Sequence, residues 1–197
     1  MNLEDSVSLI NEFLGSATVF EHSVAQMIEE ELGRSSPDAR LSASQLKLLK
    51  LVGLSGATTV GDVALFLEIS NAAASKAVDK LVGLSLLRRN EGARDRRAIH
   101  LSLTGEGRTV LKNYDSAAQL RLTRIFGEFS TEELGRTVDL LDALSTLIVD
   151  HRAKRGEICV KCGIFFRRRC SIKHRLGRLC LHLRPREQRL GEPGSSD

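Results

Sequence analysis

The chain has 197 residues, of which 42% are hydrophobic and 27% are charged, and its formal net charge at pH 7 is +4. This composition indicates a folded protein with one main domain and an appended segment. The sequence has no run of about 18 apolar residues that could cross a bilayer, and its acidic start lacks the positive region of a secretory signal. We therefore expect a cytoplasmic protein with no membrane partner.

A long amphipathic helix is predicted at the start of the chain. Apolar residues recur at three- and four-residue spacing from about Leu3 to Leu32. Gly33 can adopt a left-handed helix cap, and Pro37 disfavours helix at the residue before it. The helix is therefore expected to be ended by Gly33 and the Ser-Ser-Pro-Asp run after it.

Two short helices are predicted next. Ser42 and Thr59 each precede a Gln or Asp by three positions, which is the spacing of a capping box. Gly53 and Gly56 are expected to break the first helix, and the second is expected to cover residues 60–67.

A third short helix, from Asn71 to about Leu84, places apolar residues on one face and small or polar residues on the other. Ser70 is expected to cap it, and the positive end of the helix dipole favours a phosphate there. With the preceding helix it would form a helix–turn–helix. Its candidate DNA contacts are Ser70, Asn71, Ala72, Ser75 and Lys76.

The residues from Leu86 to Thr104 have the pattern of a β-hairpin. Ile99, Leu101 and Leu103 alternate with polar residues, as in a half-buried strand. The tip holds three guanidinium groups around one carboxylate, more charge than a hairpin needs for stability. These candidate contacts are Arg94, Asp95, Arg96 and Arg97. Helix followed by basic hairpin predicts a winged helix–turn–helix, a mainly α fold with a small β-wing, in which the helix enters a major groove.

This region resembles the MarR (multiple-antibiotic-resistance regulator) family of transcription factors. The matching features are Leu81 at the helix end, Arg88 or Arg89 in the first strand, Asp95 with Arg97 in the wing, and the Leu101-Ser102-Leu103-Thr104 strand end. The resemblance implies that Arg97 enters a minor groove and that Asp95 orients it. It covers roughly residues 3–150. Ser85 departs from the pattern, because the family commonly has a left-handed glycine at the helix end.

Two more helices are predicted after the hairpin, with Thr104 as the cap of the first and Ser130 with Glu133 as the capping box of the second. Their long apolar stripes, and that of the first helix, exceed what a short winged motif can cover, so another subunit or an intrachain bundle must cover them. The resemblance implies a homodimer on a pseudo-palindromic operator, with half-sites roughly 34 Å apart. The predicted division is residues 1–36, an N-terminal dimerisation helix; 41–104, the DNA-binding lobe; and 105–153, the C-terminal dimerisation helices.

The last part of the chain differs in charge and in cysteine content. Residues 151–190 contain thirteen Lys and Arg but two Asp and Glu, a net charge of +11. All four cysteines lie within residues 156–183, which we interpret as a metal-binding module, followed by a basic and then flexible tail over 184–197.

The candidate metal ligands are Cys159, Cys162, Cys170 and Cys180. The first pair has C-x-x-C spacing followed by Gly163, the form of a metal knuckle. The second pair lacks that spacing, and His174 or His182 lies close enough to replace one of its members. Structural zinc is the favoured interpretation, an iron–sulfur cluster is the alternative cofactor, and reactive thiols that form disulfides are the third.

The sequence as a whole predicts a dimeric, sequence-specific regulator of double-stranded DNA, with the cysteine module stabilising or tuning DNA binding. The resemblance adds a repressor role and a small-molecule effector. Two alternatives remain open: an RNA-binding or scaffold protein that acts through the basic module, and a redox-sensing regulator. No nucleophile–base pair or glycine-rich phosphate loop points to an enzyme.

Overall fold

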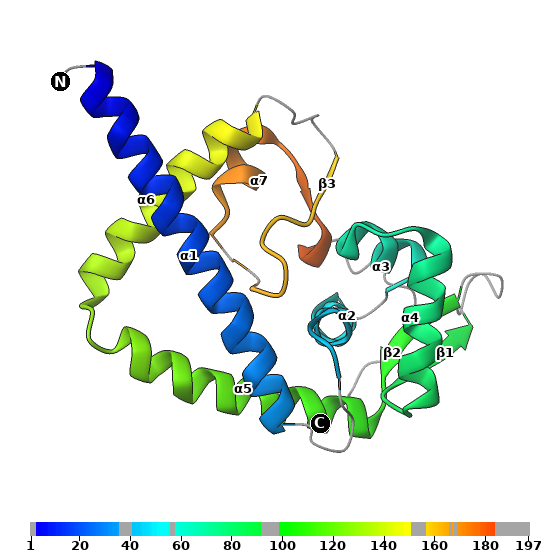
Figure 1. Ribbon diagram of the computed structural model, residues 1–197. Helices are drawn as coiled ribbons and strands as arrows, with labels where there is room; N and C mark the ends of the chain where they lie inside the picture. Colours follow the sequence, from blue (N-terminus) through cyan, green and yellow to red (C-terminus); the bar gives the residue numbers. More distant parts are fainter. Residues whose placement is uncertain are drawn as a thin grey trace, which may run out of the picture.

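The computed structural model describes residues 3–35, 41–55, 58–91, 99–150, 157–165, 167 and 169–183. These residues form a mainly helical protein with one antiparallel hairpin, which is the predicted fold class (Figure 1). No helix in this part of the chain is long and apolar enough to span a membrane. The elements are α1 (Leu3–Ser35), α2 (Ala43–Ser55), α3 (Val60–Leu67), α4 (Asn71–Gly83), β1 (Leu87–Glu91), β2 (Ile99–Leu103), α5 (Gly105–Phe126), α6 (Thr131–Asp150), β3 (Ile158–Cys159), α7 (Ser171–Leu176), β4 (Leu179–Cys180) and the 3-10 helix η1 (Leu181–Leu183).

The main core lies in the lobe formed by α2, α3, α4, the hairpin and the start of α5. Leu46, Val63, Val78 and Leu101 come from four different elements and are all fully buried. Burying one such side chain stabilises the fold by about 1.5 to 3 kcal/mol. The lobe therefore has enough apolar contact to hold α4 and the hairpin in a fixed relation.

Local hydrogen bonds start most of these helices where the sequence predicts. Thr59 and Asp62 form a complete capping box at α3, in which the Thr59 hydroxyl accepts from the Asp62 amide at 3.2 Å. The Ser42 amide donates to the Gln45 side chain at 2.8 Å. Ser130 and its partner three residues later repeat the arrangement at α6.

Two helices continue past the first glycine that was predicted to end them. α1 ends at Ser35, within the predicted Ser-Ser-Pro-Asp run, and α2 continues through Gly53 and ends at Ser55, directly before Gly56. A Cβ at Gly53 would lie 3.1 Å from the Leu103 and Leu111 side chains. This glycine lets the hairpin and α5 approach α2 closely, so its role is packing and not termination.

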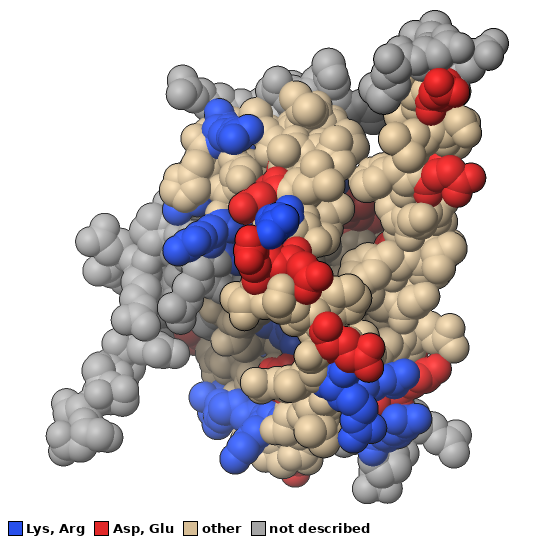
Figure 2. Space-filling model, turned by 90° about the vertical axis from the view of Figure 1, so that its left-hand side faces the viewer, with Lys and Arg blue, Asp and Glu red and all other residues tan. Residues whose placement is uncertain are grey.

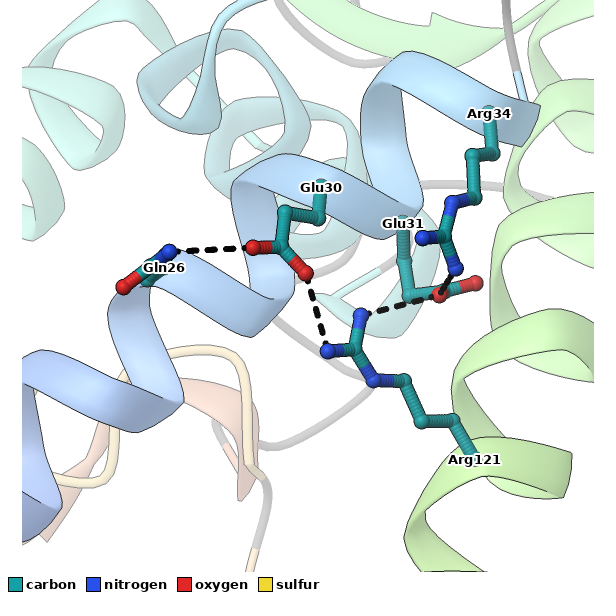
Figure 3. A network of polar contacts seen from close by, with 5 residues as sticks. All are labelled: Gln26, Glu30, Glu31, Arg34 and Arg121. Atoms are coloured by element: carbon teal, nitrogen blue, oxygen red, sulfur yellow. Dashed lines mark hydrogen bonds and ion pairs between the residues drawn. The ribbon is translucent and has the colours of Figure 1, made fainter.

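Polar contacts join α1 and α5 where the two helices cross. The Arg121 guanidinium on α5 donates to Glu30 at 2.8 Å and to Glu31 at 3.1 Å, and Arg34 and Gln26 complete the network (Figure 3). The Arg121 guanidinium is the main cause of the lowered pKa of Glu30. The network fixes the C-terminal end of α1 on α5.

The rest of α1 and one side of α6 expose apolar residues. Large side chains that are 39% to 70% exposed include Val7, Leu9, Ile10, Phe13, Leu14, Val19 and Phe20 on α1, and Val138, Leu140, Leu141, Leu147 and Ile148 on α6. Figure 2 shows this side of the molecule, where broad uncharged areas separate small groups of charged side chains. Apolar surface of this extent marks an interaction site.

The cysteine segment lies between α6 and the lobe that contains α2, α3 and α4 (Figure 1). Its short helix α7 packs against α6, and η1 packs against α2. Ile164 and Leu181 are 6% and 3% exposed and belong to the lobe's own hydrophobic core. The segment therefore takes part of its order from the lobe, which its sparse apolar content did not suggest.

Candidate nucleic-acid interface

The turn between α3 and α4 has the geometry needed to present α4 at the surface. Glu68 ends α3 in the left-handed region with φ of 54°, and the Ile69 amide donates to the Ala64 carbonyl at 3.0 Å. Ser70 then caps α4, its hydroxyl accepting from the Ala73 amide at 3.2 Å. The predicted cap is confirmed, and the first amides of α4 remain at the surface, where a phosphate can approach.

The outward face of α4 brings together the residues predicted to contact DNA. Asn71, Ala72 and Lys76 are exposed and Ser75 is half-buried. The opposite face is anchored by three residues with no exposed surface: Ala74, Val78 and Leu81. Because one face is locked into the core, the other can present short polar side chains without reorganisation.

The hairpin beside α4 is antiparallel, with Leu87 opposite Leu103 and Glu91 opposite Ile99. Thr58 adds a one-residue third strand, since its carbonyl accepts from the Leu101 amide at 2.7 Å. The prediction of half-burial fails at Ile99, which is 47% exposed because it lies at the outer end of the hairpin, beyond the core. Arg94, Asp95, Arg96 and Arg97 lie outside the described residues.

Side chains of the hairpin also bind each other and α4. The Arg88 Nε and the Asn90 amide both donate to the Ser102 hydroxyl, at 2.9 and 2.7 Å. Arg89 forms an ion pair with Asp79 of α4 at 2.7 Å. The pair is exposed, links β1 to α4 and contributes little to stability.

The helix end at Ser85 keeps the usual geometry without glycine. Ser85 adopts φ of 58° itself, and the Leu86 amide donates to the Leu81 carbonyl at 3.0 Å. The Thr104 hydroxyl donates to the Ser85 carbonyl at 2.6 Å and also caps α5. The departure from glycine therefore changes the residue and not the cap.

Sequence reasoning missed two cations that lie close to α4. An open cleft beside the start of this helix is lined by Glu68, Ser70 and Asn71 on one side and by Lys161 and Arg178 on the other. Lys161 forms a long ion pair with Glu68, at 3.5 Å. The two residues are more than ninety positions apart, so no sequence signal could pair them.

The four cysteines are brought to one place. All are free thiols, and all line one cavity of about 280 Å³ between the segment and α6. The parallel pairing of β3 and β4 sets Cys159 opposite Cys180. Gly163, with φ of 54°, completes the turn that brings Cys162 back toward the cavity. Burial, and next the neighbouring thiols, raise the pKa of Cys162.

The metal interpretation is only partly matched by this geometry. Among the described residues, no group of three or more His, Cys, Asp or Glu side chains is placed so that it could hold an ion. The two histidines do not line the cavity: His174 lies on α7, and His182 contacts the Gly163 carbonyl at 3.1 Å and packs edge-on against Phe66. Burial lowers the pKa of His182. Histidine replacement of a cysteine is therefore not favoured.

The arrangement of α3, α4 and the β1–β2 hairpin defines a winged helix–turn–helix protein. Residues 41–99 match the model of the MarR family, so this chain contains a MarR-family domain. Proteins of that family are transcription regulators and not enzymes. A comparison with curated protein sequences found no match.

Solved structures with the same fold span most of the chain. The MarR family transcription regulator SP03579 is 15% identical, with a TM-score of 0.66 over 75% of this chain and 95% of that one. Streptococcus pneumoniae FabT in complex with DNA is 20% identical, with a TM-score of 0.61 over 74% and 99%. Bordetella bronchiseptica BpsR is 23% identical, with a TM-score of 0.50 over 66% and 98%. At these identities the likeness shows the fold alone.

Proposed function

We propose that this protein is a MarR-type transcription regulator that binds a pseudo-palindromic DNA operator as a homodimer and acts as a repressor. The observation that carries the proposal is the exposed polar face of α4, anchored from behind by fully buried residues and adjoined by the hairpin. A helix held in this way fits a major groove, with the hairpin over the neighbouring backbone.

The homodimer part of the proposal is supported by the exposed apolar residues of α1 and α6. A second copy that covers both helices would bury this surface across a two-fold axis. Two copies of α4 would then face the same side of a duplex, roughly 34 Å apart, as a pseudo-palindrome requires.

The residues on α4 are expected to act in two different ways. Asn71 and Ser75 have short hydrogen-bonding side chains suited to base edges, so changing both to Ala should alter the preferred DNA sequence. Lys76→Ala should leave the preferred sequence unchanged, lower affinity for all sequences, and reduce the salt slope by about 1 if Lys76 contacts a phosphate.

A selection on randomised duplex DNA, with the wild type and both variants in parallel, measures these effects and tests the proposed function. Recovery of one sequence by the wild type and a different one by the double variant is the expected result. An unchanged sequence would place base reading elsewhere. Failure of the wild type to enrich any duplex, together with tight binding of single-stranded RNA, would replace the proposal with the RNA-binding alternative.

Arg97 in the wing is expected to contribute to affinity without contributing to the fold. Arg97→Ala should weaken operator binding by about 1 to 3 kcal/mol and leave the unfolding midpoint unchanged. Asp95→Ala should weaken binding less, because Asp95 is proposed to orient Arg97 and not to touch DNA. Titration of the selected duplex at physiological salt is the measurement, and wild-type affinity in Arg97→Ala would refute the wing contact.

A small organic effector is part of the proposal. In BpsR, DNA binding is regulated by 6-hydroxynicotinic acid. Here an open hollow along α1, lined in part by Asn11, Gly15 and Phe20, lies among the exposed apolar residues that a second copy would cover. A panel of aromatic acids, scored for changes in operator affinity, tests this part, and no change with any of them would count against it.

The cysteine module completes the proposed function as a metal site that stabilises or tunes DNA binding, with zinc favoured over an iron–sulfur cluster. The support is the C-x-x-C-Gly turn at Gly163 and the shared cavity of Cys159, Cys162, Cys170 and Cys180. Four thiolates suit tetrahedral Zn²⁺. The free thiols are also compatible with the redox-sensing alternative. Comparing the number of disulfides in protein purified in air and in protein purified without oxygen tests it.

A further inference from the structure

The cavity of the four cysteines has an unusual electrostatic lining. Besides the thiols, its charged residues are the cations Lys161, Arg167, Lys173 and Arg178 and the acid Asp142. The Nε of Arg178 is buried and has no hydrogen-bond partner among the described residues. Four cations thus line a cavity to which α6 contributes one carboxylate.

The balance of charge in the cavity favours a divalent metal ion held by four thiolates over two disulfides. A divalent ion held by four thiolates carries a net charge of −2, which the surrounding cations offset. Two disulfides would be neutral and would add no negative charge to the carboxylates Asp142, Glu68 and Glu157, with which Arg167, Lys161 and Arg178 already pair. The described side chains are not placed so that they could hold an ion. Metal binding must therefore draw the four sulfurs together, and the walls of the cavity move with them.

One wall of the cavity is α6 itself. Asp142, Ser145, Ile148 and Val149 of this helix line it. Asp142 forms a bidentate ion pair with Arg167, in which Nη2 lies 2.7 Å from Oδ2. Its carboxylate also accepts a hydrogen bond from the Ser171 hydroxyl at 3.0 Å. Arg167 is also the main reason for the lowered pKa of Asp142. The module is therefore fastened to α6 by a half-buried polar anchor.

The other side of the module is fastened to the DNA-binding lobe. Ile164 and Leu181 lie in the lobe's core, and His182 packs edge-on against Phe66 of α3, with ring centroids 6.0 Å apart. Lys161 reaches Glu68, at the turn that leads into α4. Tightening the module would therefore pull on the α3–α4 turn.

The module packs against both of these parts of the protein. In the described ranges, α6 packs against α7, and any contact it makes with α1 to α5 is marginal. Within one chain, the position of α6 relative to α4 therefore depends on the cysteine segment together with the short turn, residues 127–130, that joins α5 to α6. If α6 forms the dimer interface, this segment also sets the separation of the two copies of α4.

We propose that Cys159, Cys162, Cys170 and Cys180 bind one Zn²⁺ per chain, and that the loaded module is a strut that fixes α6 relative to α4, so that metal occupancy sets operator affinity. The metal site rests on the four thiols that line one cavity, whereas the effect on DNA rests on the proposed function. The two parts can fail separately.

The first measurement is the metal content of the full-length protein purified without oxygen. We expect one zinc per chain, and we expect Co²⁺ to replace it and to give a thiolate-to-metal absorption band. The double variant Cys159→Ser, Cys162→Ser should neither contain zinc nor show this band. Wild type that is metal-free and does not take up Co²⁺ overturns the site. Bound iron with acid-labile sulfide overturns the zinc assignment in favour of a cluster, and disulfides in the anaerobic protein favour the redox alternative.

The second measurement is affinity for the selected duplex before and after chelation. We expect chelation to change the affinity of the wild type by about 5- to 150-fold, the range typical of coupled sites. Asp142→Ala should keep one zinc per chain but lose most of that change, because the anchor to α6 is gone while the thiols remain. Asp139→Ala, an exposed acid on the same helix, is the matched control and should behave as the wild type.

Each outcome assigns a different failure. Loss of zinc in Asp142→Ala would overturn the four-thiolate ligand set. Zinc with no effect of chelation on affinity would leave a metal site and refute the strut. If the wild type selects no duplex, the proposed function fails, and the strut is then read from amide exchange in α4 and α6, where unchanged protection on chelation refutes it.

Discussion

Replacing Leu140 and Leu147 with lysine should convert the protein from dimer to monomer and reduce operator affinity by on the order of 100-fold or more, because one half-site contact can no longer assist the other. These side chains are 57% and 65% exposed in the single chain and lie seven residues apart, on the same face of α6. In the proposed dimer they would be buried, where an unpaired lysine is costly.

A matched control separates the interface from the added charge. Glu132→Lys with Asp139→Lys adds more positive charge to exposed positions of the same helix. Added positive charge by itself favours DNA, so a loss of binding in the leucine variant cannot arise from charge. Light scattering and titration of the selected duplex are the measurements. A leucine variant that remains dimeric would place the interface elsewhere, and a monomeric wild type would refute the homodimer.

Local chemistry accounts for what the sequence predicted correctly. The caps at Thr59, Ser70 and Thr104 depend on residues within three positions of one another, so their hydrogen bonds follow from spacing alone. The outward face of α4 was also predictable, because the helical spacing of its apolar residues indicates which side chains enter the core. The resemblance of the hairpin is confirmed by the family match over residues 41–99.

Tertiary contacts account for the errors and omissions. Gly53 looked like a helix end but provides space for Leu103 and Leu111, two residues from distant elements. Arg121 reaches Glu30 across ninety-one positions, and Arg167 reaches Asp142 across twenty-five. Neither pair has a periodic signal, since ion pairs depend on how the helices cross.

The cysteine module shows the same division. Its C-x-x-C-Gly turn could be predicted from the sequence. Its position between α6 and the lobe could not be predicted. That position depends on Ile164 and Leu181 entering a core formed mainly by residues 41–118. Metal binding by the thiols and its proposed effect on DNA binding stay predictions.

The second large effect is expected at the junction of hairpin and α5, where Gly107→Ala should destabilise the fold by about 1 to 3 kcal/mol, as overpacking of a rigid contact does. A Cβ at Gly107 would lie far inside contact distance of the Leu86 carbonyl oxygen and 3.4 Å from the Leu103 side chain. The Leu86 carbonyl accepts from the Thr104 amide at 3.1 Å, so it cannot retreat without disturbing the start of the hairpin.

Gly105→Ala is the matched control two residues earlier in the same helix. A Cβ there meets nothing within 4 Å among the described atoms, so we expect a change within about 0.5 kcal/mol. Urea unfolding at one fixed protein concentration compares the two, because a dimer's midpoint depends on concentration. Gly107→Ala should also weaken operator binding, since moving Leu86 redirects β1 and the wing relative to α4. Equal midpoints for the two variants would show that α5 shifts freely, and that the hairpin is not held by this contact.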